Sequence, residues 1–184
     1  KALEGKYSAE LLDRLWAHSA EIAALAASIG RELDFPDDVI EGAYVSGLLH
    51  DMGKILLEGR HPDAYRVLQQ HCEQKQAPAA AVESLIAGVN HVRIGARMAE
   101  HWELPERLVQ AIRYSRSPLS ANPAARGCAQ LIYLAHPLLH RLEGSAKEYD
   151  IDDAALASFG VETRGGGEGL VERLGRAKAE AAAS

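Results

Sequence analysis

The spacing of apolar residues restricts this chain more than any other feature of its sequence. Between Cys128 and Leu142, apolar side chains recur every three or four residues, which is the repeat of one face of an α-helix. A similar stripe runs from Leu11 to Ile22 and includes His18. No stretch shows the strict alternation of apolar and polar residues that a half-buried strand requires. The sequence therefore predicts an all-α protein.

Helix start and stop signals outline the remaining elements. Asp37 or Asp38 can cap one helix, Asn90 can cap another, and Pro62 suits the first turn of a third. Pro137 interrupts the last long stripe, and we expect a kink or a break there because proline lacks the backbone donor. The other helices expected from the pattern cover residues 37–50, 62–71, 79–87, 91–102, 108–112, 152–159 and 170–183.

The chain divides into two parts of different composition. Residues 1–142 form the predicted helical core, and residues 143–184 form a C-terminal helical extension. Residues 165–167 are all glycine and are expected to make a flexible joint within that extension. Because the chain begins at Lys1 rather than at a methionine, we expect it to be a piece of a longer protein.

Composition argues against several classes of function. The net charge of −6, with no run of Lys or Arg, disfavours binding to a nucleic-acid phosphate backbone. Cys72 and Cys128 lie in no metal-binding spacing, and two isolated thiols suit a reducing compartment. No apolar run approaches the roughly 18 residues that a membrane helix requires. We therefore expect a cytoplasmic protein that binds neither nucleic acid nor a membrane.

One short motif stands out for its chemistry. His50 and Asp51 lie next to each other at the end of a predicted helix, where an imidazole and a carboxylate can reach one divalent metal. His18 and His91 both fall on inward-facing helical stripes and could complete such a site. Lys54 could neutralise charge on a phosphoryl group, and a metal ion would supply the chemistry that cleaves a phosphate ester. In an active enzyme the candidate catalytic residues are therefore Asp51 and Lys54.

A purely structural interpretation of this motif is also open. His50 would favour the negative end of a helix dipole, and Gly53 would end the helix in the left-handed conformation. That interpretation accounts for Gly53 and Lys54 without any metal. It does not account for His18 and His91, which also lie on inward-facing stripes.

Four other residues have more than one interpretation. Trp16 and Trp102 are expected to anchor the core, because aromatic side chains bury the most area per residue. Arg93 and Arg97 lie on one predicted helix and could bind a phosphate or a carboxylate. Ordinary solvated charge is the favoured interpretation of both arginines.

Four blocks of sequence carry a resemblance to a known family. They read Leu-Trp-Ala-His-Ser at 15–19, Gly-Leu-Leu-His-Asp-Met-Gly-Lys at 47–54, His-Val-Arg-Ile-Gly-Ala at 91–96 and Trp-Glu-Leu-Pro at 102–105. In this order, residues 11–142 resemble the HDOD family, a divergent branch of the HD and HD-GYP metal-dependent phosphohydrolases. The resemblance implies an HD-superfamily helical bundle. The family usually has a further helical half ahead of the first block, and we expect that half to be missing here.

The sequence departs from its catalytic relatives at three places. Tyr114 and Ser115 stand where those relatives carry a metal-binding pair of histidines. His136 stands where they carry a ligand aspartate. Arg14 stands where HD-GYP relatives carry a glutamate, and its positive charge would be unfavourable beside a metal ion. The resemblance leaves five candidate metal ligands: His18, His50, Asp51, His91 and His136. One carboxylate with several imidazoles favours a single Fe, Zn, Ni, Co or Mn ion over a two-metal centre.

These observations support three functional hypotheses. The first is a bacterial signalling or regulatory module with a degenerate metal site, which acts through protein partners or fused signalling domains and could form a homodimer. The second is a metal-dependent phosphohydrolase or phosphodiesterase that acts on a nucleotide or cyclic nucleotide. The third is a sensor that binds a metal or nucleotide without turnover. The resemblance and the damaged ligand set favour the first.

Overall fold

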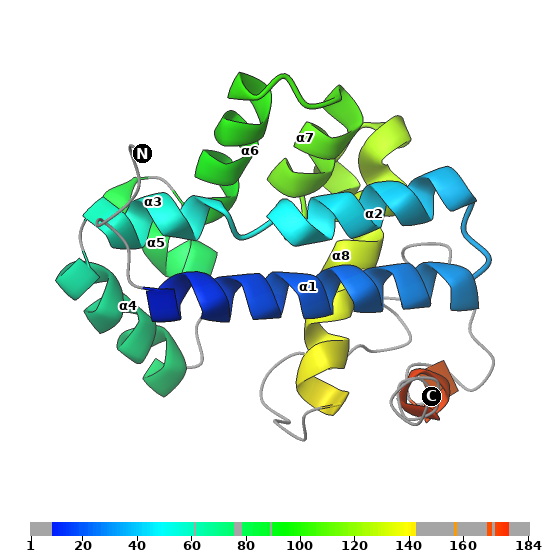
Figure 1. Cartoon of the computed structure of the whole chain (residues 1–184), viewed down its shortest axis with the longest axis horizontal. Helices are drawn as coiled ribbons and strands as arrows, with labels where there is room; N and C mark the ends of the chain where they lie inside the picture. Colours follow the sequence, from blue (N-terminus) through cyan, green and yellow to red (C-terminus); the bar gives the residue numbers. More distant parts are fainter. Residues whose placement is uncertain are drawn as a thin grey trace.

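The computed structural model describes residues 9–60, 62–75, 79–88, 90–142, 157, 169–170 and 172–176. Within these residues every regular element is helical, and the prediction of an all-α protein is confirmed (Figure 1). The elements are α1 (Ala9–Glu32), α2 (Asp37–Leu49), α3 (Gly53–Arg60), α4 (Pro62–Lys75), α5 (Ala79–Ala87), α6 (His91–His101), α7 (Glu106–Arg113), the 3₁₀ helix η1 (Pro118–Ser120) and α8 (Pro123–Leu142).

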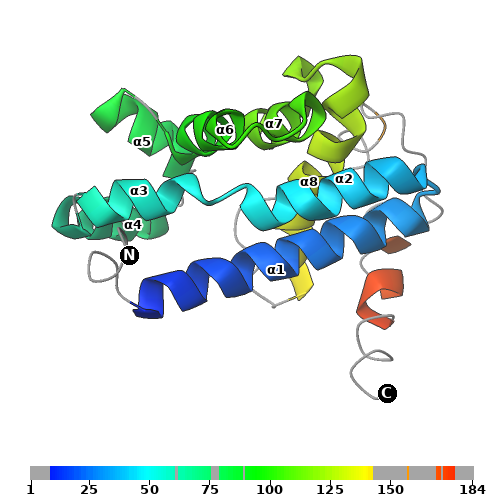
Figure 2. The same ribbon diagram turned by 45° about the horizontal axis from the view of Figure 1, so that its top comes forward.

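The centre of the fold is a core shared by α1, α2 and α8. Helices α1 and α2 run side by side, and α8 crosses them (Figures 1 and 2). Ile22 and Ile29 of α1 are fully buried against Leu131 and Leu138 of α8, as the stripes in the sequence predicted. Leu170, from the C-terminal part of the chain, is fully buried in the same core. Gly47 lets α2 approach α1, because a Cβ there would lie 2.9 Å from the Cα of Ala23.

Helices α3 to α7 form a second group that packs on this core. Helix α7 packs against α2, α6 packs against α7 and α3, and α3 to α5 continue beyond the carboxyl end of α2 (Figure 2). A smaller apolar cluster joins the two groups, with Met52 packed against Ala96, Val109 and Ile112. This arrangement brings the end of α2, the start of α6 and the middle of α8 toward one another.

Helix α3 was missed by the sequence analysis, and the structural interpretation of Gly53 was wrong. Gly53 begins α3 instead of ending α2 in a left-handed turn, and Gly88 is the positive-φ glycine of the described residues. The glycine is required for a close approach: a Cβ at position 53 would lie 2.0 Å from the carbonyl oxygen of His91 and 2.8 Å from the nitrogen of Gly95. The start of α3 therefore rests directly on the backbone of α6.

Two further expectations are corrected by the structure. Of the kink or break expected at Pro137, the break is wrong, because α8 continues through that residue to Leu142, with Pro137 buried in the helix. Packing of α8 against α1, α2 and α7 outweighs the cost of an internal proline, which is about 3 kcal/mol. Trp16 and Trp102 do not anchor the core: they are 63% and 52% exposed. Trp16 follows the buried Leu15 by one residue and so lies on another face of α1, and Trp102 lies just beyond the end of α6.

Parts of the predicted organisation fall outside the residues that the structure describes. The glycine joint at 165–167 and most of the helices expected over 152–159 and 170–183 lie outside the described residues. The division at residue 142 stays a prediction, although Leu170 and Leu174 both pack into the central core. None of the described helices is long and apolar enough to cross a membrane.

The approach of α3 to α6 makes a clear prediction. Replacing Gly53 by alanine should lower the free energy of unfolding by about 3 kcal/mol, because the new methyl group would overlap the backbone of α6. Urea denaturation followed by circular dichroism measures this change. Gly95→Ala is the matched control, since a Cβ there meets its nearest atom at an ordinary 3.5 Å. Equal stability of the two variants would contradict the proposed close contact.

Candidate metal centre

Four helices bring the predicted site residues together. His18 comes from the middle of α1, His50 and Asp51 follow α2, His91 begins α6, and His136 lies within α8. His50, Asp51, His91 and His136 are buried, and the His18 side chain is 31% exposed. The site therefore lies inside the protein, with its one partly exposed side at α1.

The side chains form a compact cluster around Asp51. One nitrogen from each of His18, His50 and His136 lies within 4.8 Å of the other two. The Nε2 atoms of His50 and His136 are 3.2 Å apart. Asp51 Oδ1 lies 3.2 Å from His50 Nε2 and 3.3 Å from His91 Nε2, and Asp51 Oδ2 lies 3.7 Å from His18 Nε2. His91 thus reaches the three clustered histidines through the carboxylate of Asp51.

Backbone carbonyls determine which nitrogens of His50 and His136 carry the proton. His50 Nδ1 lies 2.7 Å from the carbonyl oxygen of Gly47, and His136 Nδ1 lies 2.9 Å from that of Ile132. Because a carbonyl oxygen only accepts, each Nδ1 must donate. When neither ring carries a second proton, the two Nε2 atoms face each other with lone pairs at 3.2 Å. They cannot hydrogen-bond to each other, so a cation between them would satisfy both.

A buried glutamate likewise determines which ring nitrogen of His91 carries the proton. Glu83 Oε2 accepts from the backbone nitrogen of His91 at 2.7 Å and from its Nδ1 at 2.6 Å. His91 Nε2 is left without a hydrogen, and it faces Asp51 Oδ1 at 3.3 Å. Both atoms are buried and have no hydrogen-bond partner. Carboxylates that orient a metal-bound imidazole in this way are common in metal sites.

Glu83 is a site residue that the sequence analysis missed. It is 1% exposed, and the hydroxyl of Tyr65 donates to its Oε1 at 3.5 Å. The available signal was a single acidic residue within the apolar stretch of α5, eight residues before His91. Since α5 had only a weak helical pattern, nothing in the sequence indicated which way this side chain would point.

Lys54 contacts the site from the first turn of α3. Its Nζ donates to Asp51 Oδ2 at 2.5 Å, and the side chain is 15% exposed. The ammonium group thus neutralises the buried carboxylate and leaves Asp51 Oδ1 directed at the histidines. In this arrangement Lys54 is engaged by Asp51 rather than by solvent.

Burial sets the charge states of the cluster. It lowers the pKa of His18 to about 4, and it also lowers the pKa values of His91 and His136. Burial alone would raise the pKa of Asp51, but the charges of His50 and Lys54 hold that pKa well below its usual value. At neutral pH these three imidazoles are therefore neutral and the carboxylate is ionised, which are the forms that bind metal ions.

The residues at the three departures lie in different surroundings. Arg14 pairs with Glu58 at 3.6 Å and is 58% exposed, so its charge does not face the histidines as the sequence suggested. Arg116, which follows α7, instead lowers the pKa values of His18 and His136 through its charge. Tyr114 packs beside a small cluster of alanines, and Ser115 is buried.

The spacing and chemistry of the donors fit one transition-metal ion. Two nitrogens bound about 2.1 Å from an ion at a tetrahedral angle are separated by about 3.4 Å. The Nε2 atoms of His50 and His136 are 3.2 Å apart, and Asp51 Oδ1 lies at the same distance from His50. Imidazole nitrogens with one carboxylate oxygen suit Fe, Zn, Ni, Co or Mn. The orphaned atoms of His91 and Asp51 lie beside this group of donors, outside the three histidine nitrogens that lie within 4.8 Å of one another.

Comparisons with known proteins identify the family. The model of the HDOD domain matches residues 2–118, so this chain belongs to the HDOD family. The match includes His18, His50, Asp51 and His91, whereas His136 lies beyond its end. An uncharacterized protein of Treponema pallidum (strain Nichols) is 23% identical over 125 residues, which cover 68% of this chain and 24% of that protein.

Three crystal structures share the fold. A protein of Marinobacter aquaeolei VT8, provisionally named a signal transduction protein, has a TM-score of 0.73 at 21% identity over 96% of this chain. An HDOD domain protein of unknown function from Geobacter sulfurreducens has a TM-score of 0.61 at 23% identity over 77% of this chain. A protein of Shewanella amazonensis SB2B, provisionally named a phosphohydrolase, has a TM-score of 0.65 at 22% identity over 94% of this chain.

All of these relatives are longer than this chain. The alignments cover 37%, 48% and 61% of the three crystallised chains and about a quarter of the Treponema protein. At these identities the structural similarity establishes the HDOD fold alone. It assigns neither an activity nor a ligand to this chain.

The lowered histidine pKa values predict a pH-dependent stability. Between pH 6.5 and about 4 the unfolded chain binds protons that the buried His18 does not, so stability is lost as pH falls through this range. The metal-free protein should be about 2 kcal/mol less stable at pH 5 than at pH 7 in urea denaturation. His18→Gln should reduce that difference, and His71→Gln, on the exposed face of α4, should not. A stability that is unchanged between the two pH values would disprove this account.

Proposed function

We propose that this chain is an HDOD regulatory module that holds one divalent transition-metal ion without efficient phosphate-ester hydrolysis. The ligands are His18, His50, Asp51 and His136, and His91 closes the site beside Asp51. The ion would connect α1, α2, α6 and α8 and so couple the relative positions of these helices to metal binding. The proposal extends the family assignment, because membership of the HDOD family alone does not determine whether the site is active.

One observation carries this proposal. The Nε2 atoms of His50 and His136 face each other at 3.2 Å, while their Nδ1 atoms donate to the carbonyl oxygens of Gly47 and Ile132. Two buried nitrogen lone pairs at this distance repel each other unless a proton or a metal ion lies between them. Burial disfavours the proton, because it lowers the pKa of His136 well below its ordinary value. A metal ion between the two rings would satisfy both atoms.

The donor set supports regulation over catalysis. Two-metal hydrolysis uses carboxylates that bridge ions about 3.5–4 Å apart. In the described part of the site, Asp51 is the carboxylate that faces the imidazoles, and Lys54 already engages its Oδ2. Glu83 is directed at His91 Nδ1 and not toward the clustered nitrogens. A second ion would therefore find few negatively charged ligands.

A metal-dependent phosphohydrolase is the alternative function, and one observation favours it. His18 leaves one side of the site partly exposed, and the positive charge of Arg116 acts on that side. A bound divalent ion would supply Lewis acidity toward a phosphoryl oxygen. Arg116 could then orient an anionic substrate beside His18, while Asp51 and Lys54 would hold the charge balance of the site. The Shewanella protein that shares the fold is provisionally named a phosphohydrolase.

Metal content provides the first test. The protein purified without chelators should contain one transition-metal ion per chain, measured by inductively coupled plasma mass spectrometry. His50→Ala and His136→Ala should each lose the metal, because each removes a buried ligand. His101→Ala, on the exposed end of α6, is the matched control. Circular dichroism verifies folding, and full metal content in both folded site variants would exclude the proposed centre.

The position of Glu83 provides a second test. Glu83→Gln removes the charge that orients His91, and it should weaken metal affinity roughly 10–100-fold. Competition with a chromophoric chelator measures the affinity. Glu41→Gln changes the same charge on the exposed face of α2 and should leave the affinity unchanged. An equal effect of the two substitutions would mean that Glu83 does not act through the site.

Turnover separates the two candidate functions. The metal-loaded protein should show no more hydrolysis of bis(4-nitrophenyl) phosphate or of a cyclic dinucleotide than its His50→Ala variant. Hydrolysis that requires both the metal and His50 would instead establish the phosphohydrolase. Protein partners, fused signalling domains and a homodimer remain predictions from the family, and size-exclusion chromatography with light scattering tests the last of these.

A further inference from the structure

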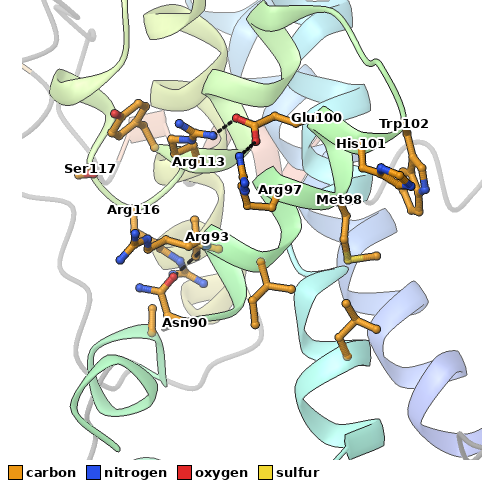
Figure 3. A pocket seen from close by; sticks show the side chains of 15 residues that line it. Asn90, Arg93, Arg97, Met98, Glu100, His101, Trp102, Arg113, Arg116 and Ser117 are labelled. Carbon is orange, nitrogen blue, oxygen red and sulfur yellow. Dashed lines mark hydrogen bonds and ion pairs between the residues drawn. The ribbon is translucent and has the colours of Figure 1, made fainter. Parts of the chain in front are cut away.

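A second candidate site lies on the other side of α6, away from the clustered histidines. A cleft of about 1070 Å³ runs between α6, α7 and the segment that follows α7. Four of its lining residues are arginines, namely Arg93, Arg97, Arg113 and Arg116, and Glu100 is the acidic residue among them (Figure 3). None of the five candidate metal ligands lines this cleft. It therefore carries a function separate from the metal centre.

Glu100 neutralises only one end of the cleft. Its two oxygens pair with Arg97 Nη1, at 2.9 Å, and with Arg113. Figure 3 shows these three side chains meeting at Glu100, while Arg93 and Arg116 lie together beside Asn90. No carboxylate of the described residues pairs with Arg93 or Arg116. The end of the cleft that these two arginines form is thus strongly positive.

Arg116 differs from an ordinary surface arginine. Its Nε is buried and has no hydrogen-bond partner. A buried donor of a charged group costs free energy when it is left unsatisfied, so such donors are normally paired. Surface solvation, which the sequence analysis favoured for Arg93, does not explain the placement of Arg116 next to it. An anion between the two guanidinium groups would reduce their repulsion and provide acceptors.

The charge of the cleft contrasts with that of the whole chain. The chain carries a net charge of −6, yet four arginines and one glutamate line this surface. A local positive potential in an acidic protein attracts small anions selectively. The planar, forked guanidinium group matches the geometry of phosphate oxygens and binds them through two parallel hydrogen bonds. Two such groups at one end of a cleft are typical of phosphate recognition.

The remaining wall of the cleft is apolar and aromatic. It contains Leu56, Ile94, Met98, Trp102 and Tyr114. Trp102, which is 52% exposed, lies beside His101 at the end opposite Arg93 and Arg116 (Figure 3). Sites for small molecules combine an apolar lining with a few polar groups that fix orientation. The lining therefore suits an organic molecule with a phosphate at one end.

We propose that this cleft binds a small phosphorylated organic molecule, with its phosphate held by Arg93 and Arg116 and its planar body against the apolar wall. This inference does not depend on the metal centre and goes beyond the function proposed for it. It adds a ligand site to a module whose partners are otherwise inferred from its family. Arg116 lines the cleft and also acts electrostatically on His18 and His136, so it lies between the two sites.

Isothermal titration calorimetry on the metal-free full chain tests this proposal with three probes. Adenosine monophosphate carries both a phosphate and a planar ring, inorganic phosphate carries only the anion, and adenosine carries only the ring. We expect adenosine monophosphate to bind at least about tenfold more tightly than either of the other two. Equal binding of inorganic phosphate and the nucleotide, or no binding of the nucleotide at millimolar concentration, would overturn the proposal.

Matched variants locate the bound phosphate. Arg93→Gln and Arg116→Gln should each weaken the nucleotide at least about tenfold and leave adenosine unchanged, because each removes one charged donor. Arg66→Gln, which makes the same change on the exposed face of α4, should have no effect. His50→Ala disables the metal centre and should leave nucleotide binding intact. Loss of binding in His50→Ala, or retention in both cleft variants, would place the phosphate elsewhere and refute this assignment.

Discussion

The buried carboxylate of Asp51 is the constraint around which the structure is arranged. A charge that is 1% exposed is costly unless positive or polar groups surround it. Asp51 meets that requirement through the ammonium group of Lys54 from α3, while its Oδ1 faces the imidazoles of His50 from the end of α2 and of His91 from the start of α6. All three helices begin or end at this carboxylate. The groups that surround the buried charge and the packing of these helices therefore depend on each other, and a change in one would alter the other.

The central core and the site share the helices that form them. Ile22 lies on the same face of α1 as His18, and Leu139 lies on the same face of α8 as His136, so the packing that buries the aliphatic side chains also directs the imidazoles inward. Backbone carbonyls one turn earlier then determine the tautomer of His50 and His136. The Nε2 lone pairs of His50 and His136 meet because the packing of regular helices places both rings at the same point. No strained loop is required for this convergence.

Much of the fold was visible in the sequence, because helical periodicity and inward histidines follow from the same repeat. The stripe on α1 placed His18 on an inward-facing side, the family resemblance supplied His136, and Asn90 does cap α6. The predictions that failed concern contacts between helices that are far apart in the sequence. Nothing local distinguishes a glycine that ends a helix from Gly53, whose role depends on α6 lying against it. The roles of Glu83 and Arg116 could not be predicted for the same reason. Glu83 accepts from His91 of another helix, and the charge of Arg116 acts on His18 and His136 of two others.

The contact between Gly53 and the first turn of α6 also bears on how this protein moves. Two helices that touch backbone to backbone have no side chains between them that could slide or change rotamer. Helix α3 and the start of α6 must therefore shift together or separate completely, and Lys54 and His91 would be carried with them. A signal that reaches either helix would consequently be transmitted as a rigid displacement, and intermediate positions would be sparsely populated.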